Sequence, residues 1–463
     1  MSRVAEAWQA KAPAPLLAAW SAAIALAHGP VRRAELAAPA AALAGSWWTL
    51  QKPERWLGVF FAAALLLPPL PVAIGDSGPH PCLLVAVLGL FAGVLWLGRW
   101  RVARSGLNAA LSALFAALLA SVAQAALHSG AVAAAGSLAR VGLFGIGVYV
   151  YFYAAEGPGK GGDPYRQARV LYWVAAAAAL FACIDFYFQF PAPAGYGAQF
   201  VWLDSGVYRR AQGLFYEAST LGNFCAFFLV MILVALACPP ADSPVSRKGL
   251  WAGGAVLLAA LVLSYSRASL VTVAVAGAML LWRNRGRFRA GRLCAIAVAA
   301  AAGSALVWKL FPVFADIYWL RLSSSAEFLF TATNGVLSGR VESWRALVSW
   351  IAAHPAGALL GVGYKTLPYT DAAGSAMVAD NMYLSVLVET GVAGLAALIW
   401  LNAAILLAAA KASRAADARR AFLGTWMLCF WSGEIIQMFS GDLLTYWRVL
   451  PVYFWVLAAA VRQ

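Results

Sequence analysis

VLSYSRASLVTVAVAGAMLLWRNRGRFRAGR, residues 262–292, combines the three features that decide the fold. An apolar run ends just before Arg267, a second apolar run follows it, and a basic segment, 282–292, comes next. Each run is long enough to enter a membrane, where an arginine at the centre of a helix costs about 2.5–3.5 kcal/mol on insertion scales. Arg267 is therefore expected in a turn at the membrane edge, between two antiparallel membrane helices.

The composition extends this expectation to the whole chain. Hydrophobic residues make up 63% of the 463 residues and charged residues 11%, which leaves too few polar side chains for the surface of a soluble fold. Apolar runs recur about twelve times without barrel-like alternation, so we expect an all-α polytopic membrane protein of about twelve transmembrane helices. The runs lie near 56–75, 81–98, 106–127, 136–154, 169–190, 218–238, 249–265, 268–282, 293–311, 383–410, 421–438 and 447–461.

Basic loops predict the orientation of these helices. Lys and Arg are enriched in cytoplasmic loops, so the strongly basic segment 282–292 is assigned to the cytoplasm. Counting spans outward from it places every other basic cluster on the same side. The net charge of +15 is thus explained by cytoplasmic loops, and no nucleic-acid partner is expected. The other clusters are 98–105, 159–169, 244–249 and 411–420.

The same count divides the chain into four parts. Residues 1–55 form an N-terminal segment, for which a membrane hairpin and interfacial helices remain alternatives. Transmembrane helices follow over 56–311, and the C-terminal transmembrane helices occupy 383–463. Between them, 312–382 form one large periplasmic loop, and a loop of this length is usually functional rather than a simple connector.

An amphipathic helix is expected within the large loop. In SGRVESWRALVSWI, residues 338–351, apolar side chains recur at helical spacing while charged ones occupy other faces. We expect this helix to lie on the membrane surface, with Trp344 and Trp350 at the interface. The recurring apolar positions are Val341, Trp344, Val348 and Ile351.

Arginines on the predicted periplasmic side oppose the usual charge bias and so need a role other than topology. A guanidinium stays charged and donates paired hydrogen bonds to phosphate oxygens, which suits a lipid-linked pyrophosphate. Arg267 carries this argument furthest, because SYSRAS surrounds it with hydroxyls and no acid. Pairing with a local acid or with lipid headgroups is the alternative for each arginine. These arginines are Arg209, Arg210, Arg267, Arg321, Arg340 and Arg345.

Two acids precede predicted helices on the same side. Glu217 follows Arg210 in RRAQGLFYEASTLGN, where a carboxylate at a helix N-terminus contributes about 0.3–1 kcal/mol, and catalysis is an equal alternative. Asp380 precedes NMYLSVLVETGVAG, where Asp380 and Asn381 equally suit a helix cap. The six cysteines and four histidines show no ligand spacing, so we expect no metal site.

Four segments together resemble the bacterial O-antigen ligase and O-antigen polymerase (Wzy-type) superfamily. They occur in the order and at roughly the spacing of that superfamily, and they cover about 209–400. The segments are RRAQGLFYEASTLGNF (209–224), LSYSRASLVTVAVAG (263–277), SGRVESWRALVSWIAAHPAGALLGVGY (338–364) and DNMYLSVLVETGVAGLAAL (380–398).

The resemblance implies a metal-independent, cofactor-free glycosyltransferase of the bacterial inner membrane, active at the periplasmic face. Its donor would be an undecaprenyl-diphosphate-linked glycan, and a chain-length regulator protein would be a further partner. The acceptor is a lipid A core sugar in the ligase branch and another lipid-linked repeat unit in the polymerase branch. Family arginines at positions matching Arg210, Arg267 and Arg340 would bind the diphosphate, with Arg345 a further candidate. Glu217 or Asp380 would then deprotonate the acceptor hydroxyl.

Two departures from the ligase pattern favour the polymerase branch. Ligases usually place a histidine before the asparagine of the last segment, and here that position is Asp380. The FYEAS of residues 215–219 is also more similar to exopolysaccharide and capsule polymerases than to ligases, which tend to carry an Asn-Pro pair. Ligase activity remains the alternative. A transporter of lipid-linked sugars is a second alternative, although such proteins usually bury charge at mid-membrane and show internal repeats.

Overall fold

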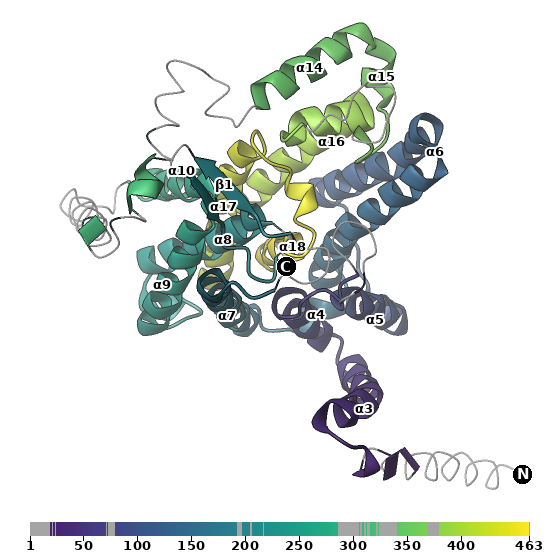
Figure 1. The fold of residues 1–463 in the computed structure, drawn as a ribbon, viewed down its shortest axis with the longest axis vertical. Coiled ribbons are helices and arrows are strands. Elements are labelled where there is room, and N and C mark those ends of the chain that lie inside the picture. The colour runs from purple at the N-terminus through teal and green to yellow at the C-terminus, as the bar shows by residue number, and fades with distance from the viewer. Residues whose placement is uncertain are drawn as a thin grey trace, which may run out of the picture.

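The computed structural model shows a mostly helical protein (Figure 1). It describes residues 19–462 except 21, 24, 71, 73–78, 192–196, 204–205, 216, 286–304, 306–307, 310–311, 313–314, 321–322, 324–339 and 368–378. Arg321 and most of the predicted run 293–311 therefore lie outside the described residues, as does the side chain of Arg340.

Each predicted apolar run among the described residues forms a helix, so the helical expectation is confirmed. One two-stranded antiparallel sheet was not predicted, in which β1 (Phe200–Leu203) pairs with β2 (Gly206–Arg209). The helices are α3 (Pro30–Gln51), α4 (Glu54–Leu66), α5 (Cys82–Leu95), α6 (Gly106–Ala155), α7 (Pro164–Phe188), α8 (Ala218–Ala237), α9 (Arg247–Leu263), α10 (Arg267–Arg283), α14 (Arg340–Ala353), α15 (Pro355–Leu360), α16 (Met382–Ala412), α17 (Ala418–Gln437) and α18 (Leu450–Val461), with short 3-10 turns at Leu97–Arg99, Pro158–Gly161, Pro240–Asp242 and Leu443–Thr445.

Several helices have the length and composition of membrane spans. Among the described residues, α6, α7, α8 and α16 are long and apolar enough to cross a membrane. With the apolar composition, this makes the chain an integral membrane protein. The number of crossings, predicted as about twelve, stays a prediction.

The long helix α6 is a hairpin of two helices. Its backbone breaks at Gly130, whose φ of 81° lies in the region that glycine tolerates. On either side of the break the chain pairs with itself. The Tyr151 hydroxyl donates to Asn108 Oδ1 at 2.8 Å, and the rings of Phe115 and Phe144 stack 6.4 Å apart. The two arms coincide with the separate runs predicted at 106–127 and 136–154.

The core is built around α18. Every residue of this helix from Leu450 to Ala460 is buried, as expected for a helix that is apolar on all faces. Figure 1 shows α18 in the middle of the other helices, and it packs on α6, α16 and α17. An aromatic cluster of Phe227, Phe430 and Tyr453, with ring centroids 4.4–4.8 Å apart, joins it to α8 and α17. In contrast, α3 lies beyond α4, set apart from the remaining helices (Figure 1).

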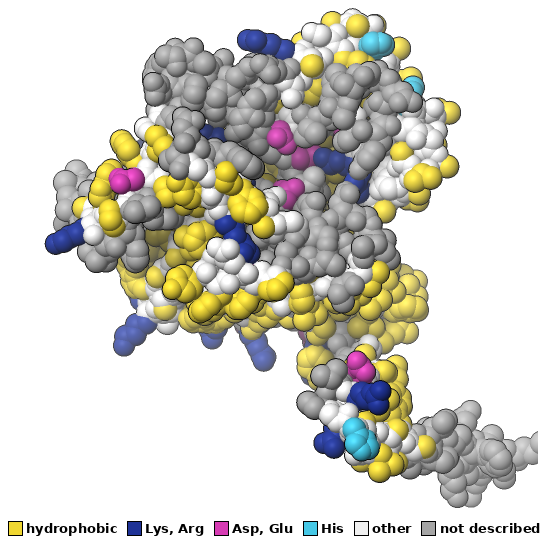
Figure 2. All heavy atoms as spheres, in the orientation of Figure 1, with side chains coloured by type: hydrophobic (Ala, Val, Ile, Leu, Met, Phe, Trp, Pro, Cys, Tyr) yellow, Lys and Arg dark blue, Asp and Glu magenta, His cyan; other side chains and the backbone are white. Residues whose placement is uncertain are grey.

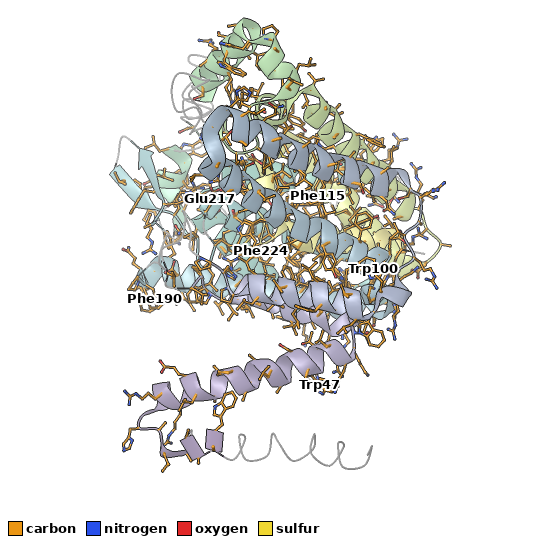
Figure 3. The ribbon with its side chains drawn as sticks, turned by 90° about the vertical axis from the view of Figure 1, so that its right-hand side faces the viewer. Trp47, Trp100, Phe115, Phe190, Glu217 and Phe224 are labelled. Atoms are coloured by element: carbon orange, nitrogen blue, oxygen red, sulfur yellow. The ribbon has the colours of Figure 1, made fainter. Side chains whose placement is uncertain are left out.

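The basic loops meet at one end of the helices, as the sequence predicted. Arg283 Nη2 donates to Ser413 O at 2.5 Å, and Arg462 Nη1 donates to Lys160 O at 2.9 Å. Arg419 pairs with Asp163 at 3.6 Å. Figure 3 shows Trp100, which belongs to another basic loop, at the end of the helices opposite Glu217 and Phe190. We call these the basic end and the Glu217 end.

The surface helix predicted in the large loop exists as α14, but the prediction of which of its side chains are buried is partly wrong. Val348 is 53% exposed, whereas Leu347 is fully buried and Trp350 is 8% exposed. These two pack with Val362, Ala379 and Val388 in a small core of their own. Trp344 Nε1 donates to Ala379 O at 2.7 Å. Trp344 and Trp350 thus hold α14 against protein, where the sequence had suggested a membrane interface.

His80, between α4 and α5, makes the fold sensitive to acid. Its side chain is buried, Nε2 donates to Leu67 O at 2.9 Å and Nδ1 accepts from the Cys82 amide at 3.2 Å. The Nδ1 bond requires the neutral ring, because a protonated Nδ1 cannot accept a hydrogen bond. Burial, and then the charge of Arg448, lowers the pKa of His80 to about 4. Because the unfolded chain binds this proton near pH 6.5, stability is complete above that pH and falls between about pH 6.5 and 4.

We therefore expect the purified protein to lose up to about 3 kcal/mol of unfolding free energy across that window. Thermal unfolding in detergent at a series of pH values measures this. The His80→Gln variant keeps a polar side chain without the titration and should show a flatter profile. A wild-type profile no steeper than that of His80→Gln would contradict the assignment.

Candidate functional site

The turn between α9 and α10 holds Arg267 at the Glu217 end. Ser264, Tyr265 and Ser266 make the turn, and Arg267 is the first residue of α10, as predicted. Tyr265 adopts a φ of 52°, which is costly for a residue other than glycine, and strain of this kind clusters at functional sites. Hydroxyls brace the turn, since Ser266 Oγ lies 2.8 Å from Ser269 Oγ. The Arg267 side chain is half-buried.

Arg210 reaches the same turn from the segment before α8. Its Nε donates to Ser264 O at 2.8 Å, and the next amide, Ala211 N, donates to Leu263 O at 2.9 Å. Two arginines separated by more than fifty residues in sequence are therefore attached to one short turn. These are two of the four arginines that the sequence nominated.

Helix α8, which begins directly after Glu217, packs closely on this turn. A Cβ added to Gly222 would come within 2.6 Å of Ser266 Cβ and 2.9 Å of Ser264 Oγ, so only glycine permits this approach. Glu217 is the N-cap of α8 and is half-buried. Its side chain makes no capping bond to the helix, and instead Oε2 accepts a hydrogen bond from Ser219 Oγ at 2.8 Å.

Tyr446 supports Glu217 and was not nominated from the sequence. It is buried just before α18 and lies close to Glu217 and to Ser219, the residue that donates to Glu217. Burial first, and then the charge of Glu217, raises the pKa of the Tyr446 phenol above its ordinary value. The phenol therefore stays neutral and can hold the Ser219 and Glu217 pair in place.

Asp380 lies at the entrance to α16, but Asn381 caps the helix. Asn381 Oδ1 accepts from the amides of Tyr383 and Leu384 at 3.0 and 3.1 Å. Asp380 itself is exposed, with a φ of 43°. The structure thus assigns the cap to Asn381 and leaves the Asp380 carboxylate at the surface, next to Ala379, on which α14 packs.

A half-buried ion pair at this end was not predicted from the sequence. Lys365, with a φ of 59°, pairs with Asp442, and Arg140 Nη1 donates to Lys365 O at 3.0 Å. Burial lowers the pKa of Lys365, but the charges of Asp442 and Glu389 outweigh it and raise the pKa above its ordinary value. Figure 2, which faces the Glu217 end, shows acidic and basic side chains gathered near the middle of this face.

The other arginines predicted on the periplasmic side have different surroundings. Arg345 is exposed on α14, and the side chain of Arg340 lies outside the described residues. Arg209 pairs with Asp185 at 3.3 Å, so the local-acid alternative holds for it. Across the part of the chain that the structure describes, no group of three or more His, Cys, Asp or Glu side chains could hold a metal ion.

The arrangement suits an anionic ligand beside a carboxylate. Helices α8, α10 and α16 all begin at the Glu217 end, and helix N-termini carry partial positive charge and unpaired amides that favour anions. Arg210 and Arg267 add full positive charge at the turn. Glu217 stands at the start of α8 with a hydroxyl to orient it, and Figure 3 shows it at the end of the helices, with Phe224 deeper in the same helix.

Comparison with known proteins supports one family. Residues 252–399 match the family model described as O-antigen ligase, which confirms the resemblance to the O-antigen ligase and polymerase superfamily. The matched range contains Arg267, Arg340, Arg345 and Asp380, whereas Arg210 and Glu217 precede it. A comparison with curated proteins gives no significant match.

Proposed function

On the premise that residues 252–399 form a domain of the O-antigen ligase family, we propose that the protein polymerises lipid-linked repeat units of a surface polysaccharide. The donor and acceptor are repeat units on undecaprenyl diphosphate, and transfer takes place at the Glu217 end, which faces the periplasm. The observation that carries the proposal is the attachment of Arg210 and Arg267 to one turn, against which α8, the helix that Glu217 precedes, packs through Gly222.

Orientation supports the periplasmic assignment. The basic loops gather at the end opposite Glu217, and basic loops are characteristic of the cytoplasmic side. Arg210 and Arg267 lie at the other end, against this charge bias, which supports a role in binding substrate. A lipid carrier anchored in the outer half of the membrane presents its diphosphate at this depth.

The reaction follows from the charges of the site. The acceptor hydroxyl oxygen bonds to the anomeric carbon of the donor sugar while the bond from that carbon to the phosphate oxygen breaks. Glu217 takes the hydroxyl proton, and Ser219 with Tyr446 positions it. Arg210 and Arg267, with Arg340 and Arg345 from α14, neutralise the negative charge that grows on the departing undecaprenyl diphosphate. Asp380 is the alternative base.

Polymerase is favoured over ligase because Asp380 occupies the position where ligases usually carry histidine. The proposal includes neither a cofactor nor a metal ion, since arginines supply the positive charge. A chain-length regulator protein is proposed as a partner at the same membrane. A transporter of lipid-linked oligosaccharide is a less favoured alternative, because the nominated arginines collect at one end of the helices.

A deletion strain tests this assignment. Surface polysaccharide is run on a gel, and lipid-linked intermediates are extracted from the membranes. Single repeat units without a ladder support polymerase. Full-length polymer left on undecaprenyl diphosphate, with a bare lipid A core, would make the protein a ligase. Repeat units trapped at the cytoplasmic face would indicate transport.

A further inference from the structure

An apolar cavity of about 440 Å³ lies beside α7, and none of its lining residues belongs to the turn that carries Arg267. Its walls come from the end of α4, the second half of α7, the segment after α7 and the loop before α8. The lining side chains used below are Leu66, Ala178, Phe181, Asp185, Phe190 and Leu214.

The cavity exists because α4 is shorter than its neighbour. The two helices begin together at the basic end, where a Cβ on Gly162 would lie 3.5 Å from Glu54 Cβ. The sequence predicted a run to residue 75, but α4 ends at Leu66 because Pro68 and Pro69 follow. Helix α7 has 25 residues and α4 has 13, so α7 extends about 18 Å further. The outer half of α7 is therefore left without a helix at this side.

Small side chains widen the space. Ala177 and Ala178 lie at the level where α4 stops, and a leucine or phenylalanine at either position would occupy the cavity. Toward the Glu217 end, Phe181 and Phe190 stack with centroids 6.3 Å apart and form an apolar wall. Leu66 and Phe190 are 38% and 43% exposed, so the cavity opens to the outside of the helices.

The loop that closes the cavity is the one that carries the catalytic candidates. Gly213 packs against α7, since a Cβ there would lie 2.7 Å from Ala182 Cβ, and Arg448 donates to Leu214 O. Arg210 precedes these residues in the loop, and Glu217 follows them. The charged group among the lining residues, Asp185, is engaged by Arg209 at the outer end.

We propose that this cavity binds the membrane-proximal part of the isoprenoid chain of the lipid-linked donor. The proposal rests on the proposed function and adds where the carrier lipid sits. A chain held here enters from the bilayer, runs outward along α7 and brings its diphosphate to the loop between Arg209 and Glu217. The only carboxylate among the lining residues is already paired with Arg209. An apolar cavity of this kind offers a sugar almost no hydrogen bonds, whereas it suits a hydrocarbon chain.

The test compares donors with long and short isoprenoid chains on the purified protein. Wild-type protein should show a KM about tenfold or more lower for an undecaprenyl-linked repeat than for the same repeat on a two-isoprene chain, because buried CH₂ groups contribute binding. In Ala178→Phe the ring fills the slot. This variant should lose the preference through a higher KM for the long donor, with kcat for the short donor unchanged.

The matched control is Leu180→Phe, which adds a ring to the same helix at a side chain that is 49% exposed and does not line the cavity. It should keep the wild-type preference. A diazirine-bearing undecaprenyl phosphate supplies a readout that needs no turnover: it should label Phe181 or Phe190 in wild type and Leu180→Phe, but not in Ala178→Phe.

The two possible failures are distinguishable. Retained long-chain preference in Ala178→Phe, or labelling that the substitution leaves unchanged, would overturn the cavity assignment while the enzyme remains active. Wild-type protein that elongates neither donor, yet is labelled at Phe181 or Phe190, would contradict the proposed function and leave the lipid site standing.

Discussion

Replacing Arg267 by alanine is expected to lower the rate of sugar transfer by about 100- to 1,000-fold. Arg267 directly follows the α9–α10 turn, where the N-terminus of α10 and Arg210 add to the same positive field. Because the diphosphate gains negative charge as the sugar departs, the loss should fall mainly on kcat. Transfer is measured as glycan elongation by purified protein, at matched amounts of folded enzyme.

Two further variants serve as controls for this result. Arg267→Lys keeps the charge but not the paired hydrogen bonds, and should recover only part of the activity. Arg104→Ala removes an exposed arginine from the basic end and should leave transfer unchanged. If Arg267→Ala strains make polymer of normal length at native expression, the diphosphate-binding role of Arg267 is wrong.

Replacing Glu217 by glutamine is expected to slow transfer by about 100- to 10,000-fold, the usual contribution of a general base. Glutamine keeps the size of the side chain and can still accept a hydrogen bond from Ser219 through its carbonyl oxygen, so the fold around α8 should persist. The acceptor hydroxyl, however, would lose the group that takes its proton. Acceptor affinity should stay near the wild-type value, so a chemically activated acceptor would have no loss of binding to restore.

Asp380→Asn is the matched comparison, because it also removes one carboxylate at a helix entrance. Asp380 is exposed and Asn381 caps the helix, so we expect a loss below about tenfold and an unchanged melting temperature. The opposite pattern, with Asp380→Asn inactive and Glu217→Gln active, would transfer the base role to Asp380. Tyr446→Phe should lower kcat without changing KM, since Tyr446 positions Glu217 and does not touch substrate.

Most of the fold could be predicted from the hydrophobic runs and glycines of the sequence. The turn at Ser264–Ser266 was predictable because Arg267 interrupts two apolar runs, and the α6 hairpin because polar residues separate its arms around Gly130. The gathering of basic loops at one end follows from the same pattern. These features depend on residues near one another in the chain, which is what periodicity detects.

Features that depend on distant partners were not predictable in the same way. Val348 and Leu347 are adjacent apolar residues of α14, and only the position of α16 decides that Leu347 is buried. The premature end of α4 had a visible signal in Pro68 and Pro69, although apolar residues continue beyond them. The predicted run was therefore too long. The cavity beside α7 is a consequence of the early end of α4.

The candidate site was predictable in part. Arg210 and Arg267 were nominated as separate residues, and the structure places both on one turn. Lys365 and Tyr446 gave no signal, because a lysine after a glycine-rich turn and a tyrosine before a helix resemble many others. Their partners, Asp442 and Ser219, lie 77 and 227 residues away in sequence. Contacts of that range require the folded chain.

The most direct measurement is elongation of lipid-linked repeat units by the purified protein in detergent or nanodiscs, followed on a gel over time. A ladder that grows on undecaprenyl diphosphate, with one undecaprenyl diphosphate released for each bond formed, is the predicted result, and Arg267→Ala should abolish it. Repeat units that stay at unit length beside the folded protein, and that lengthen neither on the carrier nor by transfer to lipid A core, would contradict a glycosyltransferase at the Glu217 end.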